Sequence, residues 1–173
     1  SLNFTIMSKI NSLIIIPTYN ESDNIIDLIN EIFLLDEDFH ILVVDDNSLD
    51  KTASLVDEKI KTSGDKLFIL KRKSKLGLGS AYSDGYKWAL SKISTNNGIE
   101  YDKKYIYDCV YTMDADFSHN PKVLLRMKVF LTENGMDLVI GSRYKTGVNV
   151  INWPIQRVLL SYFGSWYARF ITR

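Results

Sequence analysis

The chain has 173 residues, of which 46% are hydrophobic and 24% charged, a composition typical of a soluble globular domain. Its 21 Lys and Arg balance its 21 Asp and Glu, which excludes a strong net field toward nucleic acid or an anionic membrane. The single cysteine, Cys109, excludes an internal disulfide framework and favours a reducing compartment. No apolar run approaches the roughly 20 residues that a membrane-spanning helix needs, and we see no signal peptide.

The length fits one domain covering residues 1–173, with no repeat or linker that would divide it. Met7, followed by Ser8 and Lys9, resembles a natural start. We therefore expect residues 1–6 to be an addition to the natural chain.

Strand patterns and helix patterns alternate along the chain. Apolar, β-branched or aromatic runs predict strands at residues 13–16, 40–44, 66–70, 105–113 and 138–140. Amphipathic spacing predicts helices after the first four of these strands, the last of them over residues 122–133. Repeated β-then-α units predict an α/β fold with a mainly parallel sheet, helices on both faces and right-handed crossovers.

Polar and charged residues follow each predicted strand. Parallel strands end on the same edge of a sheet, which is where open α/β sheets bind ligands. The residues expected together on this edge are Tyr19 and Glu21, Asp45 and Asp46, Arg72 and Lys75, Asp114 and Asp116, and Arg143.

The most informative stretch is a D-x-D at the end of the fourth strand. Asp114 and Asp116 offer two hard oxygen donors, and Asn120 and Pro121 then predict the cap and first position of a helix. Neighbouring carboxylates repel each other, and a divalent cation shared with a substrate diphosphate would favour their charged forms. Taken alone, such a stretch is more often a turn that caps a helix than a ligand site.

Five motifs follow one another along the chain: Ile16-Pro17-Thr18-Tyr19-Asn20-Glu21, Val43-Val44-Asp45-Asp46-Asn47-Ser48 with Asp50, Gly77-Leu78-Gly79, Met113-Asp114-Ala115-Asp116-Phe117-Ser118-His119, and Ile140-Gly141-Ser142-Arg143-Tyr144. In this order they resemble inverting family 2 glycosyltransferases, and within them the dolichol-phosphate or polyprenyl-phosphate mannosyltransferases. The resemblance covers nearly the whole chain, from about Leu13 to beyond Ser161.

The resemblance implies a three-layer α/β/α GT-A fold, which is the Rossmann-like fold of nucleotide-diphospho-sugar transferases. It also implies transfer of mannose from GDP-mannose to dolichyl or polyprenyl phosphate, with inversion to a β-linked product and with Mg²⁺ or Mn²⁺ as cofactor. Because relatives continue through further elements, we expect the part of the family domain after residue 173 to be missing here.

Site residues follow from the same resemblance. It implies a nucleotide-sugar pocket made of Pro17, Tyr19, Glu21, Asp45, Asp46, Asp114, Ala115, Asp116 and Arg143, and metal ligands Asp114, Asp116 and Ser118. We also assign Lys75 to this pocket, because it lies in a basic, glycine-containing loop that suits a diphosphate, although a solvated basic loop explains it as well. We expect catalysis to depend most on Asp116, Arg143 and Arg157.

A helix opened by Trp153 and Pro154 carries Arg157 and Ser161, which are neighbours on one helical face. The resemblance assigns both to the acceptor phosphate, and an arginine fork is well suited to bind phosphate. The same helix is rich in aromatic residues, which fits either a membrane interface beside a lipid tail or an ordinary core helix.

These features predict a cytoplasmic enzyme, peripheral on the cytosolic face of a membrane (the endoplasmic reticulum in a eukaryote), with no nucleic-acid partner. One alternative is a polyprenyl-phosphate glucosyltransferase that uses UDP-glucose. Another is a catalytically inactive nucleotide-binding module. A phosphatase with Asp114 as nucleophile would need acidic residues after the D-x-D, where only Glu133 and Asp137 are available.

Overall fold

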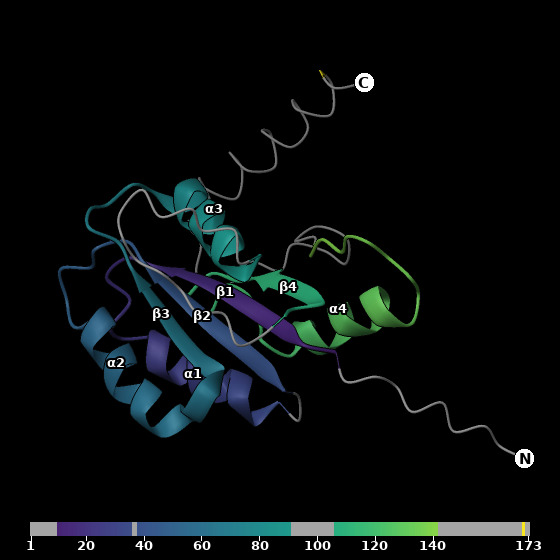
Figure 1. The fold of residues 1–173 in the computed structure, drawn as a ribbon, viewed down its shortest axis with the longest axis horizontal. Helices are drawn as coiled ribbons and strands as arrows, with labels where there is room; N and C mark the ends of the chain where they lie inside the picture. The colour runs from purple at the N-terminus through teal and green to yellow at the C-terminus, as the bar shows by residue number, and fades with distance from the viewer. Residues whose placement is uncertain (1–9, 36–37, 91–105, 142–170, 172–173) are drawn as a thin grey trace, which may run out of the picture. The chain divides into compact units, whose positions relative to one another are not determined.

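A computed structural model of the chain describes residues 10–35, 38–90, 106–141 and 171. By its internal contacts the chain divides into two units, Ser1–Met136 and Asp137–Arg173. The sheet and the helices described below all belong to the first unit (Figure 1). None of the helices within these residues is long and apolar enough to cross a membrane.

The first unit is built on a parallel sheet with the strand order β3-β2-β1-β4. Its strands are β1 (Ser12–Thr18), β2 (Phe39–Asp45), β3 (Leu67–Lys71) and β4 (Cys109–Thr112). Each neighbouring pair is parallel, so the four strands end on one edge, as the sequence predicts. The central strand β1 is buried along its whole length, which explains its continuous apolar run.

Helices cover both faces of this sheet. They are α1 (Ile25–Leu34), α2 (Thr52–Ser63), α3 (Leu78–Ala89) and α4 (Val123–Thr132), with a short 3₁₀ turn, Gly64–Lys66, before β3. Figure 1 shows α3 on one face of the sheet and α1 and α2 on the other. The layers are therefore α/β/α, as predicted.

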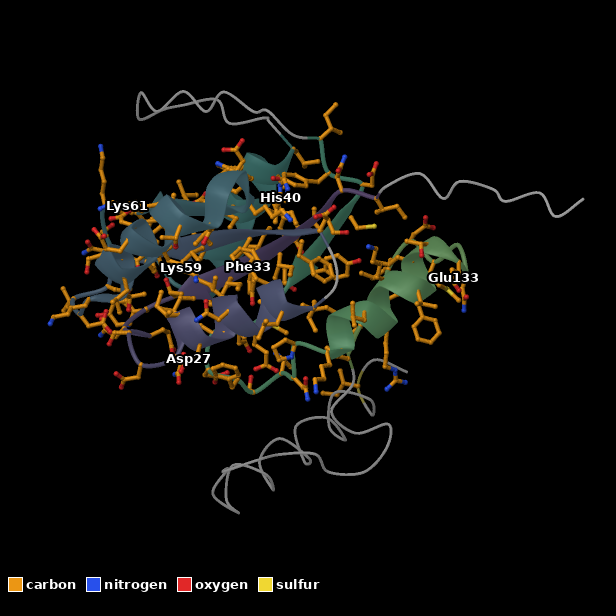
Figure 2. All side chains as sticks on the ribbon, turned by 90° about the horizontal axis from the view of Figure 1, so that it is seen from below. Asp27, Phe33, His40, Lys59, Lys61 and Glu133 are labelled. Atoms are coloured by element: carbon orange, nitrogen blue, oxygen red, sulfur yellow. The ribbon has the colours of Figure 1, made fainter. Side chains whose placement is uncertain are left out.

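The alternation of β1 side chains builds two separate cores. Ile14 and Ile16 pack with the buried faces of α1, α2 and α4, whereas Leu13 and Ile15 pack on the side of α3. Charged residues lie on the outer sides of α1 and α2, where Asp27 and Lys61 (labelled in Figure 2) are exposed. Binary patterning thus favours burial of the apolar faces of these two helices.

α3 lies unusually close to β1 because it carries a glycine at the contact. A Cβ placed on Gly85 would lie 2.7 Å from Cγ2 of Ile15, closer than real side chains approach. Only a residue without a side chain fits there, so Gly85 fixes the height of α3 above the sheet.

Two predicted elements differ from the structure. Residues 138–140 do not form a strand, and the side chains of Leu138 and Ile140 are exposed; a short apolar run predicts a strand only where a pairing partner is available. β4 is shorter than predicted. α4 begins at Val123, but Oδ1 of Asn120 still accepts a hydrogen bond from the Lys122 N–H (2.9 Å), as a capping residue does.

Candidate functional site

A cleft of about 290 Å³ opens at the edge where the strands end. β1 and β4 are neighbours in the sheet, but the chain leaves β1 for α1 on one face and reaches β4 from α3 on the other. The loops after these two strands therefore diverge, and a crevice opens between them. This is the switch point at which doubly wound sheets bind their ligands.

Segments that are far apart in sequence line this cleft. The lining residues are Pro17, Thr18, Tyr19, Glu21, Asp46, Lys75, Gly77, Leu78, Ala81, Asp114, Ala115 and Asp116. Eight of them are residues that the sequence analysis assigned to the nucleotide-sugar pocket. The loop after β1 and the D-x-D after β4 thus line the same cavity.

Asp45, which was also expected in the pocket, does not line the cleft and instead connects two loops by hydrogen bonds. It is 2% exposed, and its carboxylate accepts hydrogen bonds from the Thr18 hydroxyl (3.1 Å) and from both the N–H and the hydroxyl of Ser48 (3.0 and 2.6 Å). These bonds join the end of β1 to the turn after β2. The carboxylate of Asp45 therefore shapes the loops that form the cleft.

Asp46 is nearly as buried, at 4% exposed, but it faces the cleft and holds a different loop. Its Oδ1 accepts from Nη1 of Arg72 (2.8 Å) and from the Leu76 N–H (2.9 Å), and its Oδ2 accepts from the Gly77 N–H (2.8 Å). A buried carboxylate with a cationic partner and two backbone donors is well compensated for its loss of water. The loop from β3 to α3 is therefore folded around Asp46.

Arg72 completes this arrangement by linking Asp46 to α3. Its side chain is 5% exposed; Nη2 donates to Oγ of Ser80 (2.7 Å), and Nε lies 3.3 Å from a carboxylate oxygen of Asp84. The sequence analysis placed Arg72 on this edge but did not give it a site role. Its position directly after a predicted strand was the available signal.

One wall of the cleft carries a positive charge against an aromatic ring. Nζ of Lys75 lies 3.5 Å from the centre of the Tyr19 ring, a cation–π contact at the mouth of the cavity. Lys75 is otherwise exposed. An ammonium group held loosely in this way remains available to a phosphate.

The loop after β1 is fixed by the turn before α2. The N–H of Glu21 donates to Oγ1 of Thr52 (2.9 Å), and the N–H of Ser22 donates to Oδ2 of Asp50 (3.1 Å). Partial burial opposes ionisation of Asp50, but hydrogen bonds from Thr52 and Ser22 outweigh it and lower the pKa of this carboxyl to about 2. Asp50 is thus a structural anion of the loop pair.

The D-x-D lies on the opposite wall. Oδ1 of Asp114 accepts a hydrogen bond from the Tyr82 hydroxyl (3.0 Å), while Oδ2 lies 3.9 Å from Nδ1 of His119. Burial, reinforced by the charge of Asp114, raises the pKa of Tyr82, so the phenol stays protonated and remains a donor. The direction of the Asp114 side chain is therefore set by Tyr82, a residue of the separate helix α3.

Asp116 is held by its own turn instead. Its partial burial opposes ionisation, but the Ser118 N–H (2.9 Å) and hydroxyl stabilise the carboxylate and lower its pKa. Phe117 between them adopts φ = 57°, a left-handed conformation that a bulky residue rarely takes. The turn is therefore tightly bent at the point where Asp116 meets the cleft.

This donor set fits a divalent cation that is shared with a substrate. Within the residues that the structure describes, no group of three or more His, Cys, Asp or Glu side chains is placed to enclose a metal. Mg²⁺ is typically bound through one or two carboxylates, with substrate phosphates and water as its other ligands. Asp114 and Asp116, two carboxylates that both line the cleft, match that pattern.

The remaining predicted residues lie outside the described part of the chain: Arg143, Arg157 and Ser161. Conversely, the cleft includes Thr18, Gly77, Leu78 and Ala81, which were not assigned to it from the sequence. Thr18 was detectable as the residue between Pro17 and Tyr19, and Leu78 as part of the Gly77-Leu78-Gly79 motif. Ala81 carries no chemical signal and was not detectable.

Comparison with known proteins places these features in a family. The signature described as Glycosyl transferase family 2 matches residues 13–172. The chain is 39% identical over 160 residues to polyprenol monophosphomannose synthase of Mycolicibacterium smegmatis, covering 92% of this chain and 55% of that protein. It is 36% identical over 157 residues to undecaprenyl-phosphate mannosyltransferase of Micrococcus luteus, covering 91% of this chain and 58% of that protein.

The chain thus spans somewhat more than half the length of these two relatives. Among solved structures, residues 1–349 of TarS from S. aureus share the fold with a TM-score of 0.58 at 24% identity, covering 84% of this chain and 38% of that one. The chain belongs to glycosyl transferase family 2 and has the GT-A fold of its glycosyltransferases.

Proposed function

We propose that this chain is the catalytic domain of a metal-dependent, inverting mannosyltransferase that moves mannose from GDP-mannose to a polyprenyl phosphate such as dolichyl phosphate. The observation that carries the proposal is the shared cleft: Asp114 and Asp116 face the same cavity as Tyr19, Asp46 and Lys75. The names of two relatives, a polyprenol monophosphomannose synthase and an undecaprenyl-phosphate mannosyltransferase, support the choice of sugar and acceptor.

The donor is expected to bridge the two walls of the cleft. On one wall the buried Asp46 and the loop that it holds form a rigid surface for the nucleotide, and Lys75 supplies positive charge for the diphosphate. On the other wall Asp114 and Asp116 would hold Mg²⁺ or Mn²⁺, with Ser118 as a further candidate ligand. When bound, the cation neutralises diphosphate charge and stabilises the departing GDP.

The chemistry of the acceptor explains why no general base is needed. A phosphate monoester has a second pKa of about 6 and is therefore largely ionised near neutral pH. The protein must instead hold two anions side by side. We assign this task to Arg143, Arg157 and Ser161, which lie outside the described residues. In-line attack by a phosphate oxygen on the anomeric carbon would invert the α-linked donor to a β-linked product.

A transfer assay tests the proposal directly. Purified protein is incubated with dolichyl phosphate and either GDP-mannose or UDP-glucose, with Mn²⁺, with Mg²⁺ or with EDTA. We expect mannosyl lipid only from GDP-mannose and only with a cation. Glucosyl lipid from UDP-glucose would replace the donor assignment, and binding of nucleotide sugar without transfer in any arm would favour an inactive module.

Because the acceptor is a lipid, we also propose that the protein works at a membrane surface. Co-sedimentation with vesicles that contain dolichyl phosphate, compared with vesicles lacking it, checks this separately from turnover. Equal recovery of the protein in the supernatant of both would contradict a membrane-surface site.

A further inference from the structure

A tyrosine of α3 reaches across to the metal-binding motif. The Tyr82 hydroxyl donates to Oδ1 of Asp114 at 3.0 Å, and the two residues are 32 positions apart in the sequence. None of the motifs in the sequence analysis includes Tyr82. The contact joins the wall of the cleft formed by α3 to the wall that follows β4.

The tyrosine ring is fixed by the packing of α3. Tyr82 packs against the core on that side of the sheet, next to the fully buried Ala81. One turn further on, Gly85 allows the helix to rest directly on Ile15 of β1. A ring held by the core, on a helix whose height is set by a glycine, gives the hydroxyl a well-defined position.

The two carboxylates of the D-x-D are therefore oriented by different means. Asp116 receives its hydrogen bond from Ser118, two residues further along its own turn, and that bond forms wherever the turn forms. Asp114 receives its bond from a separate helix, so its orientation depends on the tertiary structure. Free rotation of an aspartate at a cleft edge would cost entropy on metal binding, and a fixed donor removes that cost.

Building on the proposed function, we propose that Tyr82 is a positioning residue for the cation site. Its hydroxyl occupies one oxygen of Asp114 and sets the plane of the carboxylate, so that the other oxygen is presented to a divalent cation. Hydrogen-bond partners of this kind typically alter metal affinity by about 10- to 100-fold when removed. Tyr82 itself need not contact the cation or the sugar nucleotide.

The substitution Tyr82→Phe removes only the hydroxyl and keeps the ring in the core. Tyr86→Phe is the matched control, because Tyr86 lies one turn further along α3 and is 44% exposed. Binding of Mn²⁺ in the presence of GDP is measured by the electron paramagnetic resonance signal of free Mn²⁺, and GDP binding is measured in EDTA by calorimetry.

We expect Y82F to weaken Mn²⁺ binding by about 10- to 100-fold, with GDP affinity in EDTA and the melting temperature close to wild type. Y86F should bind Mn²⁺ as the wild type does. In an Asp114→Asn background, Y82F should have little additional effect, because the carboxylate that it orients is already gone. Transfer by Y82F should recover partly at high Mn²⁺.

Equal Mn²⁺ affinity in Y82F and the wild type would overturn the inference, and so would an additive effect of Y82F and D114N. Y82F protein that fails to fold would show that the hydroxyl is structural, which also overturns it. If Y82F weakens Mn²⁺ binding but the wild type transfers no mannose, the positioning role stands and the proposed function fails. If the wild type binds no Mn²⁺ with GDP, both fail.

Discussion

The two acidic pairs of this chain look alike in sequence but differ in environment. Asp45 and Asp46 end one strand and are almost fully buried, with oxygens that accept bonds from Thr18, Ser48, Arg72 and two backbone N–H groups. Asp114 and Asp116 follow another strand and are more exposed; Asp114 accepts a hydrogen bond from the Tyr82 hydroxyl, and Asp116 accepts from Ser118 in its own turn. A carboxylate that is buried and has several hydrogen-bond donors stabilises the structure around the site. A carboxylate that is more exposed and has fewer donors is still able to bind a ligand.

The substitution Asp46→Ala should produce the largest effect, and the effect should be on stability. It would leave the guanidinium of Arg72 buried without its main partner, which typically costs about 3–5 kcal/mol. Urea unfolding followed by circular dichroism measures the loss. Asp46→Asn, which keeps the volume and one acceptor but not the charge, should lose less than Asp46→Ala; a free energy of unfolding of Asp46→Ala close to the wild-type value would show that the ion pair contributes little.

The substitution Asp116→Ala tests the other pair and should have the opposite profile. The free energy of unfolding should change little, because Asp116 is exposed, whereas mannosyl transfer should fall by about 10²- to 10³-fold through loss of charge stabilisation. Initial rates with GDP-mannose and Mn²⁺ provide the measurement. The exposed Asp27 on α1 serves as the control, and D27A should be fully active. Turnover by D116A at the wild-type rate would remove Asp116 from the site.

The substitution Gly85→Ala should displace α3 and thereby disturb the surroundings of both acidic pairs. The added methyl group would meet Ile15, and overpacking of this kind costs about 1–3 kcal/mol. Gly79→Ala is the matched control, since a Cβ there meets nothing within 4 Å. Thermal melting of the two variants gives the comparison. The expectation fails if G85A is as stable as G79A.

The smallest effect concerns Asp50 and acid. Its folded pKa of about 2 lies below the ordinary value of 3.8, so its stabilising contribution is complete above about pH 4 and is lost as the pH falls toward 2. Asp50→Asn should flatten the pH dependence of stability in that window by a small amount, because the group is exposed. Urea midpoints at pH 2.5 and pH 5 for both proteins measure this difference. Parallel curves would show that the hydrogen bonds to Asp50 do not favour its ionised form.

Much of the fold could be predicted because local pattern and tertiary structure agree. The continuous apolar runs of β1 and β2, each ending in polar residues, predict a parallel sheet whose ends gather on one edge, and the structure confirms it. The run at 138–140 looks similar but is not a strand, since hydrophobic pattern does not supply a partner.

The site was predictable only in part for the same reason. The D-x-D and the residues after β1 could be identified from residue type and position. Whether Asp45 or Asp46 faces the cleft depends on the path of the loop from β3 to α3, and the roles of Arg72 and Tyr82 depend on how α3 is placed. Such roles follow from three-dimensional contacts that sequence spacing does not encode.

Because the cleft lies between β1 and β4, binding of a ligand in the cleft is coupled to assembly of the sheet. β4 pairs with β1 in parallel, from Ser12 opposite Cys109 to Ile15 opposite Thr112, so the two walls meet only when β4 has docked onto β1. A ligand that touches both walls binds the completed sheet and not a chain lacking that docking. By mass action, sugar nucleotide at 100 times its dissociation constant would add about 2.7 kcal/mol to folding. Saturation of the enzyme with its donor would thereby also protect its edge strand from opening.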